Sequence, residues 1–249
     1  MDEKGVATLE RALTILAAFT EADLSLPLAE ISRRTGLYKS TLLRLLATLE
    51  RFGYIGQQED GNYHVGPAAL YLGSIYQRWV RPPELINPAL RQLVEQSGES
   101  ASFNVREGDI RVCIYRIDSP QKIRDHVRIG DVLPLPNGAA GKILSAFDTA
   151  RDHARWQEVR EACFASSRGE IGPDTAAVSA PVFESGGKCI GALAITGPAN
   201  RFTDEKVADM RVHVLRAALD LTYKFGGPTT QLETALHIAR SEQSRPSAS

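Results

Sequence analysis

Cysteine is scarce in this chain, which has three among its 249 residues, at Cys113, Cys163 and Cys189. They lie 50 and 26 residues apart, so there is no CxxC pair. An odd number of widely spaced cysteines does not make a disulfide framework. We therefore expect three free thiols in a reducing compartment.

Long apolar runs and catalytic signatures are also missing. No stretch approaches the roughly 18 apolar residues that span a bilayer, and the N-terminal residues MDEKG lack the apolar segment of a secretory signal. No GxSxG, HExxH, Walker or dinucleotide motif occurs, and the five histidines are dispersed. The sequence thus predicts a cytoplasmic protein that is not an enzyme, binds no metal or other cofactor, and has no membrane partner.

The net charge of −1 says little about partners, but its distribution is informative. Residues 1–66 carry seven Lys or Arg against nine Asp or Glu, a net charge of −2. Residues 31–55 reverse the sign, with five basic side chains against Glu50 and a net charge of +4. Positive charge is therefore concentrated on one short stretch, as in proteins that bind nucleic acid locally.

That stretch predicts two helices joined by a tight turn. The first covers residues 28–35, and Gly36 ends it because glycine adopts the left-handed conformation without steric cost. The second covers residues 39–51. Its buried stripe is Leu42, Leu45, Leu46 and Leu49, and its exposed line is Ser40, Arg44, Thr48 and Arg51. This pattern is typical of a helix-turn-helix that presents its second helix to the DNA major groove, although a solvated helical hairpin stays an alternative.

A two-stranded wing is predicted next. Residues 54–55 and 62–65 form the strands, and the segment QQEDG between them contains an Asp-Gly turn signal. Glu59 and Asp60 at the tip would repel phosphate. We therefore expect the flanking Gln57 and Asn62 to matter more for DNA contact.

At this point the chain resembles the IclR-type family of bacterial transcriptional regulators, over nearly its whole length. The opening pattern LERALTIL at residues 9–16 and the pattern GLYKST at residues 36–41, followed by Arg44, carry the resemblance. The family usually has proline where this chain has Tyr38, so the helix start is less fixed and an aromatic ring is placed near the DNA. A first helix at residues 6–21 has a wide apolar face, which in this family helps to pair DNA-binding domains.

The resemblance implies that the chain binds double-stranded DNA as a homodimer or homotetramer. The DNA-binding residues that we predict are Arg33, Arg34, Tyr38, Lys39, Ser40, Thr41, Arg44 and Arg51. We expect Arg44, Ser40, Thr41 and Tyr38 to meet base edges or adjacent phosphates, and the other four to hold phosphates.

The predicted fold class is α+β, with an N-terminal winged helix-turn-helix domain joined by helices to a GAF-like α/β effector-binding domain. The domain ranges are 1–66 for DNA binding, 67–83 for a helical connector, 84–226 for the effector-binding domain and 227–249 for a C-terminal tail. Beyond the wing, helices are predicted at residues 68–79, 84–96, from 139, 149–163 and 203–225, with a short one at 231–241. Strands are predicted at residues 101–106, 110–117, 123–129, 177–183 and 189–196.

The most informative stretch of the second half is residues 130–147. Pro134, Pro136 and Asn137 make a rigid loop, and the small residues 138–141 leave backbone N–H groups uncovered at a helix start. Such a helix start is an anion site; a helix packed tightly on a sheet is the alternative reading.

The resemblance favours an effector pocket here. The family's Pro-Leu and Gly-Lys pairs are seen at residues 134–135 and 141–142, with Pro136 where a histidine is common. Where glyoxylate- or pyruvate-type members carry an aspartate and a cysteine, this chain has Ser167 and Ala177, which are smaller. The predicted effector-binding residues are Asn137, Gly138, Ala139, Ala140, Gly141, Ser167 and Ala177.

The sequence as a whole predicts a ligand-responsive transcriptional repressor that senses a small organic acid, with an aromatic acid as one candidate. One alternative is a small-molecule sensor that acts through protein contacts, its winged helix serving only for dimerisation. Another is a transcriptional activator of the same family, since the same contacts serve repression and activation.

Overall fold

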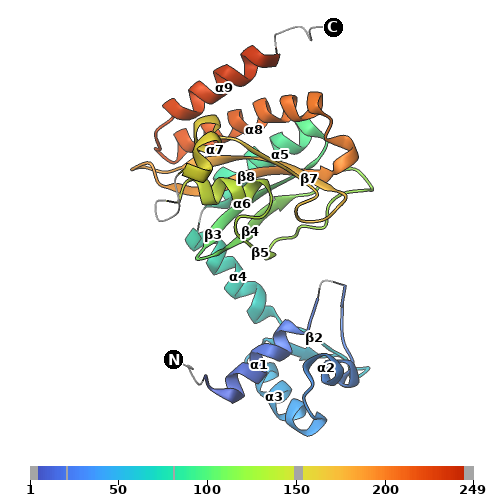
Figure 1. The fold of residues 1–249 in the computed structure, drawn as a ribbon. Coiled ribbons are helices and arrows are strands. Elements are labelled where there is room, and N and C mark those ends of the chain that lie inside the picture. The colour runs from blue at the N-terminus through green and yellow to red at the C-terminus, as the bar shows by residue number, and fades with distance from the viewer. Residues whose placement is uncertain (1–4, 21, 81, 149–153, 244–249) are drawn as a thin grey trace. The chain divides into compact units, whose positions relative to one another are not determined.

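The computed structural model describes residues 5–20, 22–80, 82–148 and 154–243. The chain divides into two compact units, Met1–Val80 and Arg81–Ser249. The first is a winged helix-turn-helix and the second an α/β unit around one sheet, which confirms the predicted fold class (Figure 1).

The first unit contains the predicted helix-turn-helix and wing. Its elements are α1 (Ala7–Ala17), α2 (Leu28–Thr35), α3 (Lys39–Arg51), β1 (Ile55–Gln57), β2 (Tyr63–Val65) and α4 (Pro67–Val80). Gly36 follows α2 with a φ of 68°, the left-handed conformation expected of it. The core of this unit consists of Ile15, Leu26, Ile31, Leu42, Leu46, Leu49, Ile55 and Tyr63. The leucine stripe predicted for α3 is therefore confirmed, with Leu45 partly buried beside it.

Helix α1 is shorter than predicted. It ends at Ala17, whereas the apolar pattern had suggested residues 6–21. The Asp23 carboxylate accepts hydrogen bonds from the backbone N–H and the hydroxyl of Thr20, at 2.9 and 2.7 Å. Such local side-chain bonds favour a turn over continued helix.

The second unit is built on six described strands, all paired antiparallel in the order β5-β4-β3-β8-β7-β6. They are β3 (Ser100–Glu107), β4 (Ile110–Ile117), β5 (Val132–Pro134), β6 (Ala165–Arg168), β7 (Thr175–Phe183) and β8 (Cys189–Pro198). The α-helices of this unit are α5 (Pro83–Ser97), α6 (Gly138–Ala146), α7 (Gln157–Ala162), α8 (Asp204–Lys224) and α9 (Thr230–Gln243).

Helices cover both faces of the sheet. Ala192 and Ala194 of β8 pack against Ala140, Ile143 and Leu144 of α6. Since successive residues of a strand point to opposite faces, the equally buried Leu193 and Ile195 point to the face where α5 and α8 lie side by side (Figure 1). None of the described helices is long and apolar enough to cross a membrane.

Two predictions for the second unit need correction. Residues 123–129 are not a strand, because β5 takes the place beside β4 and the carboxylate of Asp125 bonds to Arg116. The helix predicted at 149–163 is reduced to a 3₁₀ turn (Ala154–Trp156) and α7, while residues 149–153 lie outside the described ranges. The short helix predicted at residues 231–241 is confirmed as α9, which buries Leu232, Ala235, Leu236 and Ala239 and packs on α8.

The three cysteines are free thiols, as predicted. Burial raises the pKa of Cys113 and of Cys163 to about 12, so both stay protonated near neutral pH.

Candidate functional site

The exposed face of α3 carries most of the predicted DNA-binding residues. Tyr38 precedes the first turn with a φ of −64°, the value that proline would impose, and its ring is 84% exposed. Lys39, Ser40, Arg44 and Arg51 are exposed and Thr41 is half-buried. Ser40, Arg44 and Arg51 lie on the side of the helix away from Leu42, Leu46 and Leu49. The guanidinium of Arg51 lies 5.2 Å from the ring centre of Phe52. The sequence thus folds into a helix whose polar face is open to a ligand as large as a DNA duplex.

Both arginines of α2 form hydrogen bonds and ion pairs with other residues of the protein. Arg33 donates through Nε and Nη2 to the Glu30 carboxylate, at 2.7 and 2.6 Å. Arg34 donates to Asp23 at 2.5 and 2.9 Å, to Glu30 at 2.8 Å and to the carbonyl of Ala18 at 2.9 Å. The hydrogen bonds from Arg33, followed by the one from Arg34, lower the pKa of Glu30 to about 2. The hydrogen bonds from Arg34 hold the pKa of Asp23 well below its usual range.

The positive charge predicted for residues 31–55 is therefore smaller in the folded unit. Glu30 and Asp23, which lie outside that stretch of sequence, neutralise much of the charge of Arg33 and Arg34. Arg34 joins α2 to the segment that follows α1, so its side chain has a structural task. Arg44 has no ion pair within the described part of the chain, and its charge is available.

The predicted two-stranded wing is confirmed as an antiparallel pair, with Ile55 opposite Val65. Gln57, predicted in the turn, belongs to β1 and lies opposite Tyr63. The flanking polar side chains of the wing help to fold the tip. Gln57 donates to the carbonyl of Gly61 at 3.2 Å, and the Asn62 side chain donates to Asp60 at 2.8 Å. A contact of Gln57 or Asn62 with DNA stays a prediction.

The second unit encloses a cavity of about 220 Å³. Strands β3, β7 and β8 supply Ser102, Ala176, Ala177, Ala194 and Thr196, and the first turn of α6 supplies Gly138, Ala139 and Ala140. Residues 125–127, Asp131 and Leu133 close it from one side, and Ser167, Ile171, Gly172 and Thr175 from the other. Arg111 completes the lining.

Five of the seven predicted effector-binding residues line this cavity, namely Gly138, Ala139, Ala140, Ser167 and Ala177. The other two do not. Asn137 is exposed, and Gly141 packs against the backbone of Pro136. Gly138 has a φ of 74°, a backbone conformation that favours glycine, and a Cβ there would lie 3.1 Å from the side chain of Ile171, which is a tight contact.

The first N–H groups of α6 are not uncovered, contrary to prediction. Gly138 donates to Glu170 at 3.1 Å and Ala139 donates to the Ser167 hydroxyl at 3.0 Å. Lys142 donates to the same Glu170 carboxylate at 2.5 Å. Because protein side chains already occupy these two donors, the N–H groups of Gly138 and Ala139 are not available to an anion.

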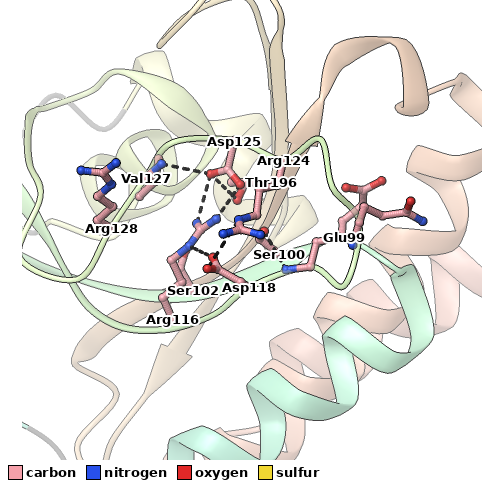
Figure 2. A network of polar contacts seen from close by, with 12 residues as sticks. Glu99, Ser100, Ser102, Arg116, Asp118, Arg124, Asp125, Val127, Arg128 and Thr196 are labelled. Atoms are coloured by element: carbon pink, nitrogen blue, oxygen red, sulfur yellow. Dashed lines mark hydrogen bonds and ion pairs between the residues drawn. The ribbon is translucent and has the colours of Figure 1, made fainter. Parts of the chain in front are cut away.

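A polar network beside the cavity was missed by the sequence reasoning (Figure 2). Asp125 accepts from Arg116 through both carboxylate oxygens, at 2.6 and 3.0 Å, and from the Thr196 hydroxyl at 3.1 Å. Arg116 also donates to Asp118 at 2.7 Å. Both side chains of the Arg116–Asp125 pair are buried, so it fixes residues 125–127 against the cavity.

Arg111 was missed as well. A possible signal was the pair of arginines, Arg111 and Arg116, within the apolar strand IRVCIYRI. No group of three His, Cys, Asp or Glu side chains in the described ranges is placed to hold a metal ion.

Comparison with known proteins gives two family matches. The IclR helix-turn-helix domain matches residues 8–59, and the Bacterial transcriptional regulator IclR C-terminal domain matches residues 83–157 and 153–223. The acetate operon repressor of Salmonella typhimurium is 27% identical, over 89% of this chain and 91% of its own length. The transcriptional repressor IclR of Escherichia coli is 26% identical, over 89% of this chain and 91% of its own length.

Solved structures give the same fold. The IclR protein of Thermotoga maritima superimposes with a TM-score of 0.75 at 20% identity, over 88% of this chain and 99% of that one. An IclR homologue of Microbacterium hydrocarbonoxydans, complexed with 4-hydroxybenzoate, has a TM-score of 0.68 at 18% identity, over 93% of this chain and 99% of that one. The family models cover both units and the relatives are regulators of transcription, so this chain belongs to the IclR family of DNA-binding transcriptional regulators.

Proposed function

We propose that this regulator is a repressor whose DNA binding responds to a small organic acid held in the cavity of the second unit. The observation that carries the proposal is that cavity of about 220 Å³. A cavity of about 150 Å³ accommodates benzene, so this one has room for a single-ring acid. Most of its lining is small or apolar, with a few polar groups, as is usual for small-molecule sites.

Two further observations support an aromatic acid. Ser167 and Ala177, both small, line the cavity where larger side chains would narrow it. The IclR homologue of Microbacterium hydrocarbonoxydans, which shares this fold, was solved in complex with 4-hydroxybenzoate. We accordingly place single-ring aromatic acids first among the effectors to be tested.

The experiment is a thermal-shift screen of the full chain against aliphatic and single-ring aromatic carboxylic acids, because a ligand that binds only the native state raises the melting temperature. Ala177→Leu adds three carbons to a half-buried position of the cavity wall and should abolish the shift while DNA binding persists. Ala154→Leu, at an exposed position, is the matched control and should keep the shift. The effector assignment fails if no acid raises the melting temperature, or if Ala177→Leu keeps the shift.

The residues that we propose to contact DNA are Tyr38, Lys39, Ser40, Thr41, Arg44 and Arg51. Arg33 contacts a phosphate when its hydrogen bonds to Glu30 are replaced by hydrogen bonds to DNA. We leave Arg34 out of the set, because its guanidinium is already bonded to Asp23, Glu30 and Ala18. Arg44 has the strongest case for base contact, since it lies on the exposed face of α3 and its charge is unpaired in the described part of the chain.

Binding of operator and random duplexes, measured by fluorescence anisotropy at several salt concentrations, tests these assignments. Arg44→Ala should weaken operator binding by about tenfold or more and reduce the preference over random DNA. Arg33→Ala should weaken both duplexes alike and lower the salt slope by about 1. Arg91→Ala, an exposed arginine of α5, is the control and should change neither. A loss of equal size on operator and random DNA in Arg44→Ala would remove it from the base-reading set.

We also propose that the regulator acts as a homodimer, with a homotetramer as the larger alternative assembly. Of the two alternative functions, a sensor that works only through protein contacts does not fit membership of a DNA-binding family. Activation in place of repression depends on where the operator lies relative to the promoter. Footprinting upstream of the protein's own gene, combined with transcription in vitro, distinguishes the two.

A further inference from the structure

One cation of the second unit is buried without a carboxylate partner. Arg111 of β4 is 6% exposed and lines the cavity. Its Nη1 donates to the Asn104 side-chain oxygen at 2.7 Å, and Asn104 donates in turn to Ser102 at 3.1 Å. Its Nε is buried and has no hydrogen-bond partner among the described residues.

Other arginines of the unit have the carboxylate partner that Arg111 lacks. Within the described ranges, Arg116 pairs with Asp125, Arg201 with Glu99, Arg106 with Asp148, and Arg211 with Glu242. The guanidinium of Arg111 has one neutral acceptor and leaves its buried Nε without a partner among the described residues, which is costly. Burial lowers the pKa of Arg111, yet an arginine side chain keeps its proton in proteins. The position therefore holds a desolvated positive charge beside an internal cavity.

The guanidinium nitrogen nearest the start of α6 is Nη2. A Cβ placed on Gly138 would lie 3.5 Å from Nη2, so this nitrogen lies beside the cavity wall where α6 begins. An arginine N–H at a cavity wall can donate a charge-assisted hydrogen bond to a carboxylate oxygen.

The acidic residues of the cavity do not neutralise Arg111 directly. Asp125 accepts two hydrogen bonds from Arg116 and one from Thr196, as Figure 2 shows for this network. Asp131 accepts from the backbone N–H of Arg128 at 2.8 Å and acts on Arg111 only through its charge. An incoming anion would supply the acceptor that Arg111 lacks.

We infer that Arg111 binds the carboxylate of the effector, and that the ligand class is a monocarboxylate with a compact apolar body. This rests on the proposed function, since it assigns one residue and one functional group to the cavity proposed above. The carboxylate accepts from Nη2 of Arg111, and the apolar body lies against Ala139, Ala177 and Ala194. Asn104 is a positioning residue, because its hydrogen bond to Nη1 fixes the plane of the guanidinium.

The test measures the affinity of the full chain for two acids and their neutral counterparts by isothermal titration. The probes are benzoate and 4-hydroxybenzoate, each compared with its amide, which has a similar shape and no charge. Arg111→Gln should weaken binding of the acids by about 10- to 100-fold, as expected for charge-assisted hydrogen bonds, and change amide binding less than about threefold. Arg111→Met, which leaves no donor unpaired, is the second variant should Arg111→Gln not fold. Arg91→Gln, an exposed arginine, is the control and should bind like the wild type.

Two results would overturn the inference while the effector site itself stands. One is equal acid affinity in wild type and Arg111→Gln. The other is binding of the amides but not of the acids by the wild type.

Formate carries a carboxylate without an apolar body. It therefore tests carboxylate binding by Arg111 independently of whether the effector is an aromatic acid. At matched ionic strength, formate should raise the melting temperature of the wild type above its value in chloride, and should not do so for Arg111→Gln. If formate distinguishes the two proteins and no aromatic probe binds, Arg111 is a carboxylate site and the proposed effector class is wrong. If formate does not distinguish them and no probe binds, both proposals fail.

Discussion

Arginine has two opposite uses in the first unit, and the surroundings of each side chain decide which applies. Arg34 is surrounded by acceptors, with Asp23, Glu30 and the carbonyl of Ala18 all within hydrogen-bond distance. Arg44 lies on the outer face of α3 and has no ion pair in the described part of the chain. Counting charges along the sequence treats the two alike. In the folded unit Arg34 stabilises the approach of α2 to α1, and the charge of Arg44 is left for DNA.

The Arg34 contacts predict a pH-dependent stability of the first unit. The pKa of Glu30 falls from an ordinary 4.5 to about 2 on folding, so its contribution is complete above about pH 4.5 and is lost as the pH falls towards 2. Asp23 shifts in the same direction. Arg34→Gln should lower the melting temperature of the unit at pH 7. The difference from wild type should shrink from about pH 4.5 towards pH 2, because the unfolded chain takes up protons on both carboxylates at a higher pH than the folded unit does.

Calorimetry across that pH range measures the difference, and Arg91→Gln in the second unit serves as the control. Should the difference stay constant down to pH 2, Arg34 acts through its bond to the Ala18 carbonyl or through packing, and not through the carboxylates.

Among elements, those governed by local signals were predictable from the sequence. The turn between α2 and α3 follows from Gly36, the burial of α3 from its leucine spacing, and the wing from an Asp-Gly turn between two short strands. Elements governed by distant partners were not. Residues 123–129 look like a strand until Asp125 meets Arg116 and Thr196. The start of α6 looks bare until Ser167 and Glu170, from a strand and loop later in the chain, reach its N–H groups.

The cavity was predictable only in part, for the same reason. The small residues at the start of α6 indicated a site, and five of the seven predicted residues do line the cavity. Arg111 was not predicted as a site residue because its role depends on its burial and on the absence of a carboxylate partner, which only the folded structure reveals. A single arginine in a strand looks like an ordinary edge residue until its burial and its missing carboxylate are known.

The hydroxyl of Ser167 predicts a measurable stabilisation of α6. It accepts the N–H of Ala139, as a capping side chain does, although it comes from β6. Loss of a capping oxygen costs about 1 kcal/mol, so Ser167→Ala should lower the melting temperature of the second unit by about 2–4 °C. Ser185→Ala, in an exposed turn, is the control and should leave it unchanged. An unaltered melting temperature in Ser167→Ala would mean that water or Glu170 replaces the lost acceptor.

At the scale of the whole molecule, the first unit exposes large apolar side chains along one helix and beside another, and such groups can mark an interaction surface. Val6, which precedes α1, is 68% exposed, and Leu9 and Leu13 of α1 are 57% and 56% exposed. On α4, the exposed apolar side chains are Leu70, Tyr71, Leu72 and Ile75. Two helices of one unit with uncovered leucines indicate a partner surface, and the partner that we propose is a second copy of this chain. Pairing also brings two recognition helices to one operator, which raises affinity without new contacts to each half-site.

Replacing exposed leucines of α1 with glutamate tests this assembly. Leu9→Glu combined with Leu13→Glu places two carboxylates on the proposed interface and should convert dimers to monomers in sedimentation velocity, because burying unpaired charge is unfavourable. Operator affinity should fall by about 100-fold or more, since each monomer then binds one half-site alone. Thr8→Glu combined with Thr14→Glu adds the same charge at exposed polar positions of the helix and should leave the assembly intact.

A leucine double variant that sediments as the wild type would place the interface elsewhere, and α4 would be the next surface to test with Leu70→Glu. If the variant is monomeric but binds operator as the wild type does, pairing is not what gives the regulator its affinity.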